Sequence, residues 1–80
     1  MGTSRDDIRH WLRIAKGKGA THMIVMCDTY DHEDYPVYVM PGENPRDKGK
    51  IENMQRPMEC YAMHLDLEMQ LNERRANHWD

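Results

Sequence analysis

The densest group of reactive side chains lies in the segment 28–35, which carries four carboxylates and no lysine or arginine. Two tyrosines are interleaved with the acids, and the six residues are Asp28, Tyr30, Asp31, Glu33, Asp34 and Tyr35. Oxygen atoms at this density could bind a metal ion, act as paired catalytic acids or contact a basic partner. Each of the three possibilities requires particular residues around the segment.

Metal binding is the least supported of the three. A calcium loop spaces its oxygen ligands around a central glycine over about twelve residues, and the chain has no glycine between positions 20 and 41. A zinc site would have to combine Cys60 and His64 with Cys27 and His32, at spacings that fit no common zinc pattern. We therefore expect no metal site and no cofactor.

Catalysis has candidate groups but no recognisable arrangement. Cys27, His32 and Asp34 contain the elements of a nucleophile and its base, and Asp28 with Asp31 could be paired acids. Successive residues of a strand point to opposite faces, and the sequence contains no phosphate-binding loop, oxyanion loop or nucleophile elbow. We expect no enzymatic activity.

The segments on either side of the acids predict the element that presents them. Apolar runs at 23–27 and 35–40 flank the acidic segment, which is typical of a β-hairpin with the acids at its turn. The first strand, predicted over 21–29, is apolar on both sides and should be central or covered on both faces. The second contains Pro36, which cannot donate a ladder hydrogen bond, so this strand should lie at an edge.

A helix is predicted from Ser4 to Lys16, with Gly17 and Gly19 ending it. Ser4 can cap the first free amides, and Asp7 can complete a capping box. Residues at i, i+3, i+4 and i+7 give one apolar face, formed by Ile8, Trp11, Leu12 and Ala15. The opposite face is basic, with Arg5, Arg9, Arg13 and Lys16. Such a face could follow a phosphate backbone, but the acidic total favours a face that is simply solvated.

Two further helices are predicted towards the C-terminus. Asn44 followed by Pro45 is a helix-start signal, and Gly49 should end that helix after about one turn. A long helix is predicted from about Arg56 to Asn77, although proline is unfavourable deep in a helix. One of its sides carries Met58, Ala62, Leu65 and Met69, and another carries Leu67 and Leu71. A helix with two apolar sides usually packs on its own sheet and on a second body.

Together these elements predict an α+β fold and a single domain over residues 1–80. The N-terminal helix, the short helix and the long C-terminal helix would pack with the β-hairpin sheet. Because two strands alone make a poor sheet, we expect either a third strand or a homodimer that extends the sheet or pairs the last helices.

Charge and composition restrict the function classes. The net charge is −3; residues 1–20 hold five bases and two acids, whereas residues 21–44 hold five acids and no base. No apolar run approaches the roughly 18 residues of a membrane span, and no signal-peptide pattern opens the chain, so we expect a soluble protein inside the cell. Cys27 and Cys60 could be bridged, but two buried thiols in a reducing cytosol are the simpler interpretation.

The runs Lys18–Val25 and Cys27–Val39 resemble a small protein encoded by phages and prophages of proteobacteria. The likeness extends to Met40–Glu43 and Asn53–Arg56, so it covers more than half of the chain. Small acidic phage proteins of this size often counter bacterial immunity, and among these the sequence resembles an anti-CRISPR protein that acts on a type I effector complex. The resemblance implies no catalytic residues.

The leading hypothesis is therefore a non-enzymatic anti-CRISPR inhibitor in the host bacterial cytoplasm. Its acids would imitate DNA phosphates in the basic DNA channel of a crRNA-guided complex, with an effector subunit as partner and no direct contact with nucleic acid. Asp66 and Glu68 of the long helix would join the acidic segment in this surface. The alternatives are a binder of another host protein, or a sponge that sequesters a cyclic-nucleotide immune signal across a dimer interface with Arg5, Arg9, Arg13 or Lys18.

Overall fold

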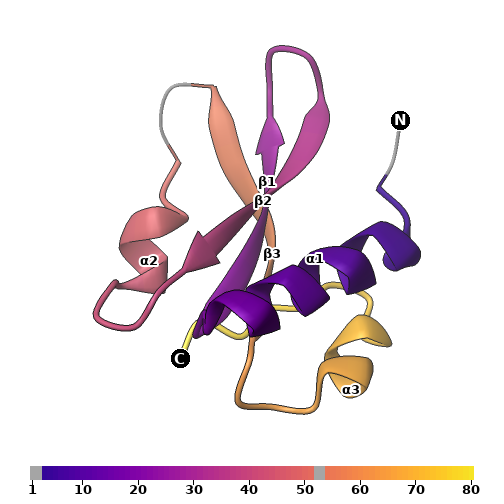
Figure 1. The fold of residues 1–80 in the computed structure, drawn as a ribbon. Helices are drawn as coiled ribbons and strands as arrows, with labels where there is room; N and C mark the ends of the chain where they lie inside the picture. The colour runs from indigo at the N-terminus through magenta and orange to yellow at the C-terminus, as the bar shows by residue number, and fades with distance from the viewer. Residues whose placement is uncertain (1–2, 52–53) are drawn as a thin grey trace.

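The computed structural model describes residues 3–51 and 54–80 and has an α+β fold (Figure 1). Three antiparallel strands form one sheet in the order β2-β1-β3, with β1 at His22–Asp28, β2 at Glu33–Val39 and β3 at Gln55–Ala62. The helices are α1 at Arg5–Lys18, α2 at Pro45–Lys48 and α3 at Leu67–Leu71. The predicted N-terminal helix, hairpin and short second helix are confirmed.

Helix α1 begins at the predicted capping box. The Ser4 side chain accepts a hydrogen bond from the Asp7 amide at 3.1 Å, and the Asp7 carboxylate accepts one from the Ser4 amide at 3.2 Å. The helix continues through Gly17 and ends two residues later than predicted. Gly19 follows it with φ 75°, the left-handed geometry that glycine tolerates best.

The sheet is apolar on both faces, as the composition of its first strand predicts. Strand β1 is central, and all its residues from His22 to Cys27 are buried. Met23 and Val25 pack with α1 on one face, whereas Ile24 and Met26 belong to a second cluster on the other. Strand β2 is an outer strand and accommodates Pro36, which confirms the edge prediction.

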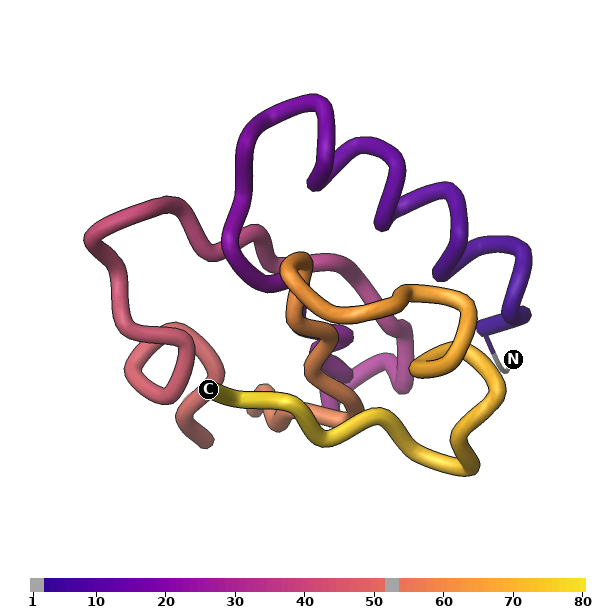
Figure 2. The backbone as a smooth tube through the Cα atoms, turned by 90° about the horizontal axis from the view of Figure 1, so that it is seen from below, coloured from indigo at the N-terminus to yellow at the C-terminus, as the bar shows by residue number. Residues whose placement is uncertain are grey.

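The C-terminal segment runs along the outer edge of β3, and its Trp79 packs against the second cluster of the sheet. Figure 2 shows the C-terminus beside α2. The Trp79 ring packs so closely on Gly49 that an added Cβ would lie 2.6 Å from a ring carbon, so this position requires glycine. The Cys60 amide donates to the Ala76 carbonyl at 3.1 Å, and the His78 amide donates to the Cys60 carbonyl at 2.9 Å. The outer edge of β3 is therefore partly paired.

The predicted long helix over residues 56–77 is wrong. This part of the chain forms β3 and then the five-residue helix α3. Pro57 is tolerated because β3 is an outer strand. A β-bulge between the partners of Val25 and Met26 leaves Met58 without a register partner. Of the residues on the two predicted apolar sides, Met58 and Ala62 lie in β3, whereas Leu67, Met69 and Leu71 lie in α3. The third strand completes the sheet within one chain.

A buried glutamine of α3 links this helix to the end of β3. The Gln70 side chain is fully buried; it accepts a hydrogen bond from the Ala62 amide at 2.8 Å and donates one to the Ala62 carbonyl at 2.9 Å. These hydrogen bonds satisfy both the backbone groups of Ala62 and the buried side chain of Gln70, so neither is left with the cost of an unpaired buried polar group.

None of the helices in residues 3–51 and 54–80 has the length and apolarity of a membrane-spanning segment.

The two cysteines are free and buried, which confirms the prediction of two unpaired thiols. In the register, Cys60 lies opposite Ile24 and Arg56 lies opposite Cys27. The cysteines are thus separated by three residue steps along β1, or about 10 Å. A disulfide needs Cα atoms within about 7 Å, so these two thiols cannot pair in this fold.

Cys60 gives a pH-dependent test of the core. Burial raises the pKa of its thiol to about 12, from an ordinary value of 9.0. Above pH 9 the unfolded chain ionises this thiol while the folded protein keeps the proton, so the free energy of unfolding should fall as pH rises from 9 to 12. The expected slope is up to about 1.4 kcal/mol per pH unit. Burial also raises the pKa of the Cys27 thiol, which acts in the same direction.

Urea unfolding of Cys60→Ala beside the unmodified protein, between pH 9 and 10, checks this prediction. The variant should be less stable at neutral pH because it leaves a small cavity, but its stability should decline less steeply with pH. Equal slopes in the two proteins would show that water reaches the Cys60 thiol.

Candidate functional site

The acidic segment forms the β1–β2 turn, at the opposite end of the molecule from α3 (Figure 1). Two of its carboxylates build the turn. Asp28 Oδ1 accepts the Tyr30 amide at 2.8 Å, and Asp31 Oδ1 accepts the Glu33 amide at 3.1 Å. The His32 amide donates to the Asp28 carbonyl at 2.7 Å, and His32 itself has φ 61°. Local hydrogen bonds of this type fix a turn without help from the core.

Distant segments hold the base of the turn. Both the amide and the hydroxyl of Thr29 donate to the Met54 carbonyl, at 2.6 and 2.9 Å. Asp34 accepts a hydrogen bond from the Thr3 hydroxyl at 2.7 Å. The Tyr35 hydroxyl donates to Gln55 Oε1 at 2.7 Å. The pKa of Tyr35 is raised, first by burial and then by the Asp28 charge.

The outward part of the turn is smaller than the sequence predicts. Asp31 and Glu33 are exposed, and Tyr30 is 80% exposed, the largest fraction among the exposed large apolar residues. Within the described part of the chain, no acid of the turn has an ion-pair partner. We call Tyr30, Asp31 and Glu33 the tip. It combines an aromatic ring with unneutralised negative charge.

The two acids predicted on the last helix do not extend the tip. Asp66 is the N-cap of α3 and accepts the Met69 amide at 3.1 Å. Glu68 forms a two-point ion pair with Arg9, and the hydrogen bond from Arg9 lowers its pKa. The structure therefore brings six of the eight predicted residues together and places the other two at the far end, where each has a local partner.

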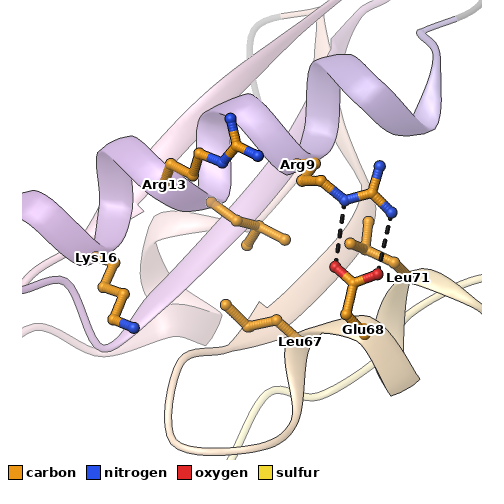
Figure 3. A pocket seen from close by; sticks show the side chains of 7 residues that line it. Arg9, Arg13, Lys16, Leu67, Glu68 and Leu71 are labelled. Carbon is orange, nitrogen blue, oxygen red and sulfur yellow. Dashed lines mark hydrogen bonds and ion pairs between the residues drawn. The ribbon is translucent and has the colours of Figure 1, made fainter.

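A pocket that the sequence does not predict lies between α1 and α3 (Figure 3). Its volume is about 210 Å³, and its lining consists of Arg9, Leu12, Arg13, Lys16, Leu67, Glu68 and Leu71. The bases recur at i, i+4 and i+7 along α1, and that signal is visible in the sequence. The contact of Leu67 and Leu71 with α1 was not predicted, because these leucines were assigned to a single long helix over 56–77.

The other bases named for the sponge hypothesis already have contacts. Arg5 pairs with Glu59 at 3.0 Å, and Lys18 lies over the Tyr38 ring, 5.6 Å from its centroid. Arg9 pairs with Glu68. Among these bases, neither Arg13 nor Lys18 has a hydrogen bond or ion pair of its side chain within the described residues, and Lys18 has only the Tyr38 ring as its contact.

The groups considered for metal binding and catalysis are dispersed. Cys60 is buried in β3, whereas His64 is exposed after the strand, with its ring edge-on to His22. His32 is exposed on the turn. Within residues 3–51 and 54–80 no three His, Cys, Asp or Glu side chains are placed to share a metal ion. Burial, with a smaller effect from Asp34, raises the pKa of Cys27, which keeps that thiol protonated and weakly nucleophilic.

Function therefore has to be inferred from the tip and the pocket. No protein-family model, no curated protein and no solved structure matches the chain.

Proposed function

We propose that the protein is a non-enzymatic binding module that places its tip on a basic surface of another protein. The observation that carries this proposal is Tyr30, which is 80% exposed between carboxylates that lack basic partners within the described residues. Tyrosine is enriched among the residues that dominate interface energies. Complementary charges around such an anchor speed association and select the partner.

The rigidity of the turn supports the same proposal. The Asp28 and Asp31 carboxylates accept hydrogen bonds from backbone amides of the turn, and Thr29 donates a hydrogen bond to the Met54 carbonyl. A turn that is ordered before binding loses less conformational entropy on association. The ordered turn should therefore bind more tightly than a turn that becomes ordered only on its partner.

The resemblance to anti-CRISPR proteins supplies the partner that we propose: a subunit of a type I crRNA-guided effector complex in the host bacterial cytoplasm. Such a complex needs a basic surface to hold target DNA. With Asp31 and Glu33 outward, the tip would imitate a short stretch of phosphates at the mouth of the channel. A long phosphate mimic would also need Asp66 and Glu68, which lie at the other end of the molecule (Figure 1).

The sponge alternative has less support. Its remaining basic site is the α1–α3 pocket, whose volume of about 210 Å³ is below the roughly 300 Å³ at which pockets enclose drug-sized ligands. It also requires a dimer. The sequence suggests one through the apolar residues in and just before the predicted last helix, which are Met54, Met58, Tyr61, Leu65 and Leu71, but these do not form a single surface, because Tyr61 is fully buried and Leu71 is 4% exposed. The homodimer and the binding of another host protein stay predictions.

A pull-down from cells that carry a type I CRISPR system tests the proposal. The tag belongs at the C-terminus, because Thr3 at the other end of the chain contacts Asp34 beneath the tip. We expect effector subunits to be recovered at low salt and less so as salt rises, since exposed charges are screened beyond about 8–10 Å at physiological ionic strength. Recovery of no effector subunit, together with a thermal shift on adding a cyclic nucleotide, would overturn the proposal in favour of the sponge.

A further inference from the structure

The α1–α3 pocket has an apolar floor and a basic rim (Figure 3). Leu12 of α1 and Leu71 of α3 are almost fully buried, at 2% and 4% exposure, and Leu67 packs against the same cluster. Arg9, Arg13 and Lys16 of α1 line the rim; in Figure 3 Lys16 extends down towards the level of Leu67, whereas the Arg13 side chain points towards Arg9. An apolar floor below a charged rim is the usual composition of a site that orients a small ligand by one polar group.

The charges of the rim do not cancel. Glu68 is the only acid in the lining, and both its oxygens are engaged by Arg9, from Nε at 3.2 Å and from Nη2 at 3.1 Å. Arg9 also donates from Nη1 to Asp6 at 2.9 Å. Neither Arg13 nor Lys16 has a side-chain hydrogen bond or ion pair within the described residues. One end of the pocket therefore carries two cations that local acids do not neutralise.

We propose that this pocket binds a small amphipathic anion, with its carboxylate or phosphate between Arg13 and Lys16 and its apolar body on the leucine floor. Residues three apart on a helix are neighbours, and Arg13 and Lys16 are both exposed. Their side chains point apart in Figure 3, so binding of one anionic group requires rotation of one or both of them towards it. The volume of about 210 Å³ restricts the ligand to fewer atoms than a drug-sized molecule. None of the pocket residues belongs to the tip, so the site does not depend on the proposed partner of the tip.

Titration of the isotope-labelled protein with simple probes tests the site by NMR. Octanoate and octyl phosphate carry the anionic group on an apolar body, octylammonium reverses the charge, and acetate lacks the body. We expect one or both of the first two probes to bind saturably and to shift the methyl signals of Leu12, Leu67 and Leu71. Octylammonium and acetate should bind at least about tenfold more weakly. The stronger of the two anionic probes identifies the head group.

A double variant, Arg13→Gln with Lys16→Gln, provides the second test. Both side chains are exposed on α1, and glutamine is a good helix former, so the fold should be retained. Affinity for the anionic probes should fall about tenfold or more, whereas Lys50→Gln, an exposed base outside the pocket, should leave it unchanged. Equal binding of octanoate and octylammonium, or unchanged affinity in the folded double variant, would overturn the proposal.

Discussion

A variant that combines Tyr30→Ala with Glu33→Lys should bind the effector complex at least about a hundredfold more weakly than the unmodified protein. Loss of an interfacial tyrosine that acts as a hot spot costs about 2 kcal/mol or more, which is roughly thirtyfold. Reversal of a neighbouring charge lowers the association rate and adds a repulsive contact. Surface plasmon resonance at two salt concentrations measures both effects, and the variant should also show a weaker dependence on salt.

The two substitutions were chosen at side chains that form no hydrogen bond in the turn. Asp28 and Asp31 accept backbone amides, and Asp34 accepts the Thr3 hydroxyl, so changes at these acids alter the fold together with the charge. Tyr30 and Glu33 are exposed, and neither side chain has a hydrogen bond within the described residues. Their replacement therefore changes the surface and leaves the turn in place.

Two single variants serve as controls. His32→Gly keeps the left-handed backbone, since φ is 61° there, and should bind normally; lost binding in this variant with an intact fold would revive a metal or catalytic role for His32. Asp80→Lys changes the net charge by as much as Glu33→Lys, but at the opposite end of the molecule (Figure 1). If Asp80→Lys weakens binding as much as Glu33→Lys, net charge and not the tip determines affinity.

Local signals in the sequence account for the elements that were predicted correctly. The Ser4–Asp7 capping box, the Asn44–Pro45 start and the two apolar runs around the acids each fix structure within a few residues. Strand β3 was missed because Met58, Tyr61 and Leu65 also fit a helical spacing, and a short apolar run does not distinguish the two periods. Its pairing with β1, between residues 27 to 40 positions apart in the chain, decides the outcome.

The candidate site likewise has a part that local sequence signals predict and a part that depends on long-range contacts. The sequence identifies the acids of the turn, but which of them point outward depends on Thr3, Gln55 and Met54, all distant in the chain. The pocket depends on α3 folding back against α1, and that contact exists only once β3 has reversed the chain direction. Contacts between remote segments leave no periodic signal in a single sequence, so neither feature could be derived from it.

Glu59→Ala should be among the most destabilising single substitutions at a polar residue of this protein, lowering the free energy of unfolding by about 2–3 kcal/mol. Glu59 Oε1 accepts three hydrogen bonds: from Arg5 Nη1 at 3.0 Å, from the Tyr61 hydroxyl at 2.9 Å and from the Ala76 amide at 3.1 Å. Arg5 also donates to the carbonyls of Glu73 and Arg74. One largely buried carboxylate thus joins the start of α1, strand β3 and the C-terminal segment.

The matched control is the other Arg–Glu pair between distant segments. Arg9 and Glu68 have comparable distances, but the Glu68 side chain is 66% exposed, against 14% for Glu59. Water can replace the partner of an exposed charge, so Glu68→Ala should lower the free energy of unfolding far less than Glu59→Ala. For a domain of this size, thermal unfolding should therefore show a fall in Tm of about 10–20 °C for Glu59→Ala, against only a few degrees for Glu68→Ala.

Glu59→Gln separates the charge from the hydrogen bonds. Because all three donors meet at Oε1, a glutamine oxygen in the same place can accept them without a negative charge. If unsatisfied donors cause the loss in Glu59→Ala, the glutamine variant should keep more than half of the stability that the alanine variant loses. If the ion pair itself causes the loss, the two variants should be equally unstable. A Glu59→Ala protein as stable as Glu68→Ala would show that water satisfies these donors. In that case the apolar face of α1, and not Glu59, would be the main attachment of the N-terminal segment, including Thr3 beneath the tip.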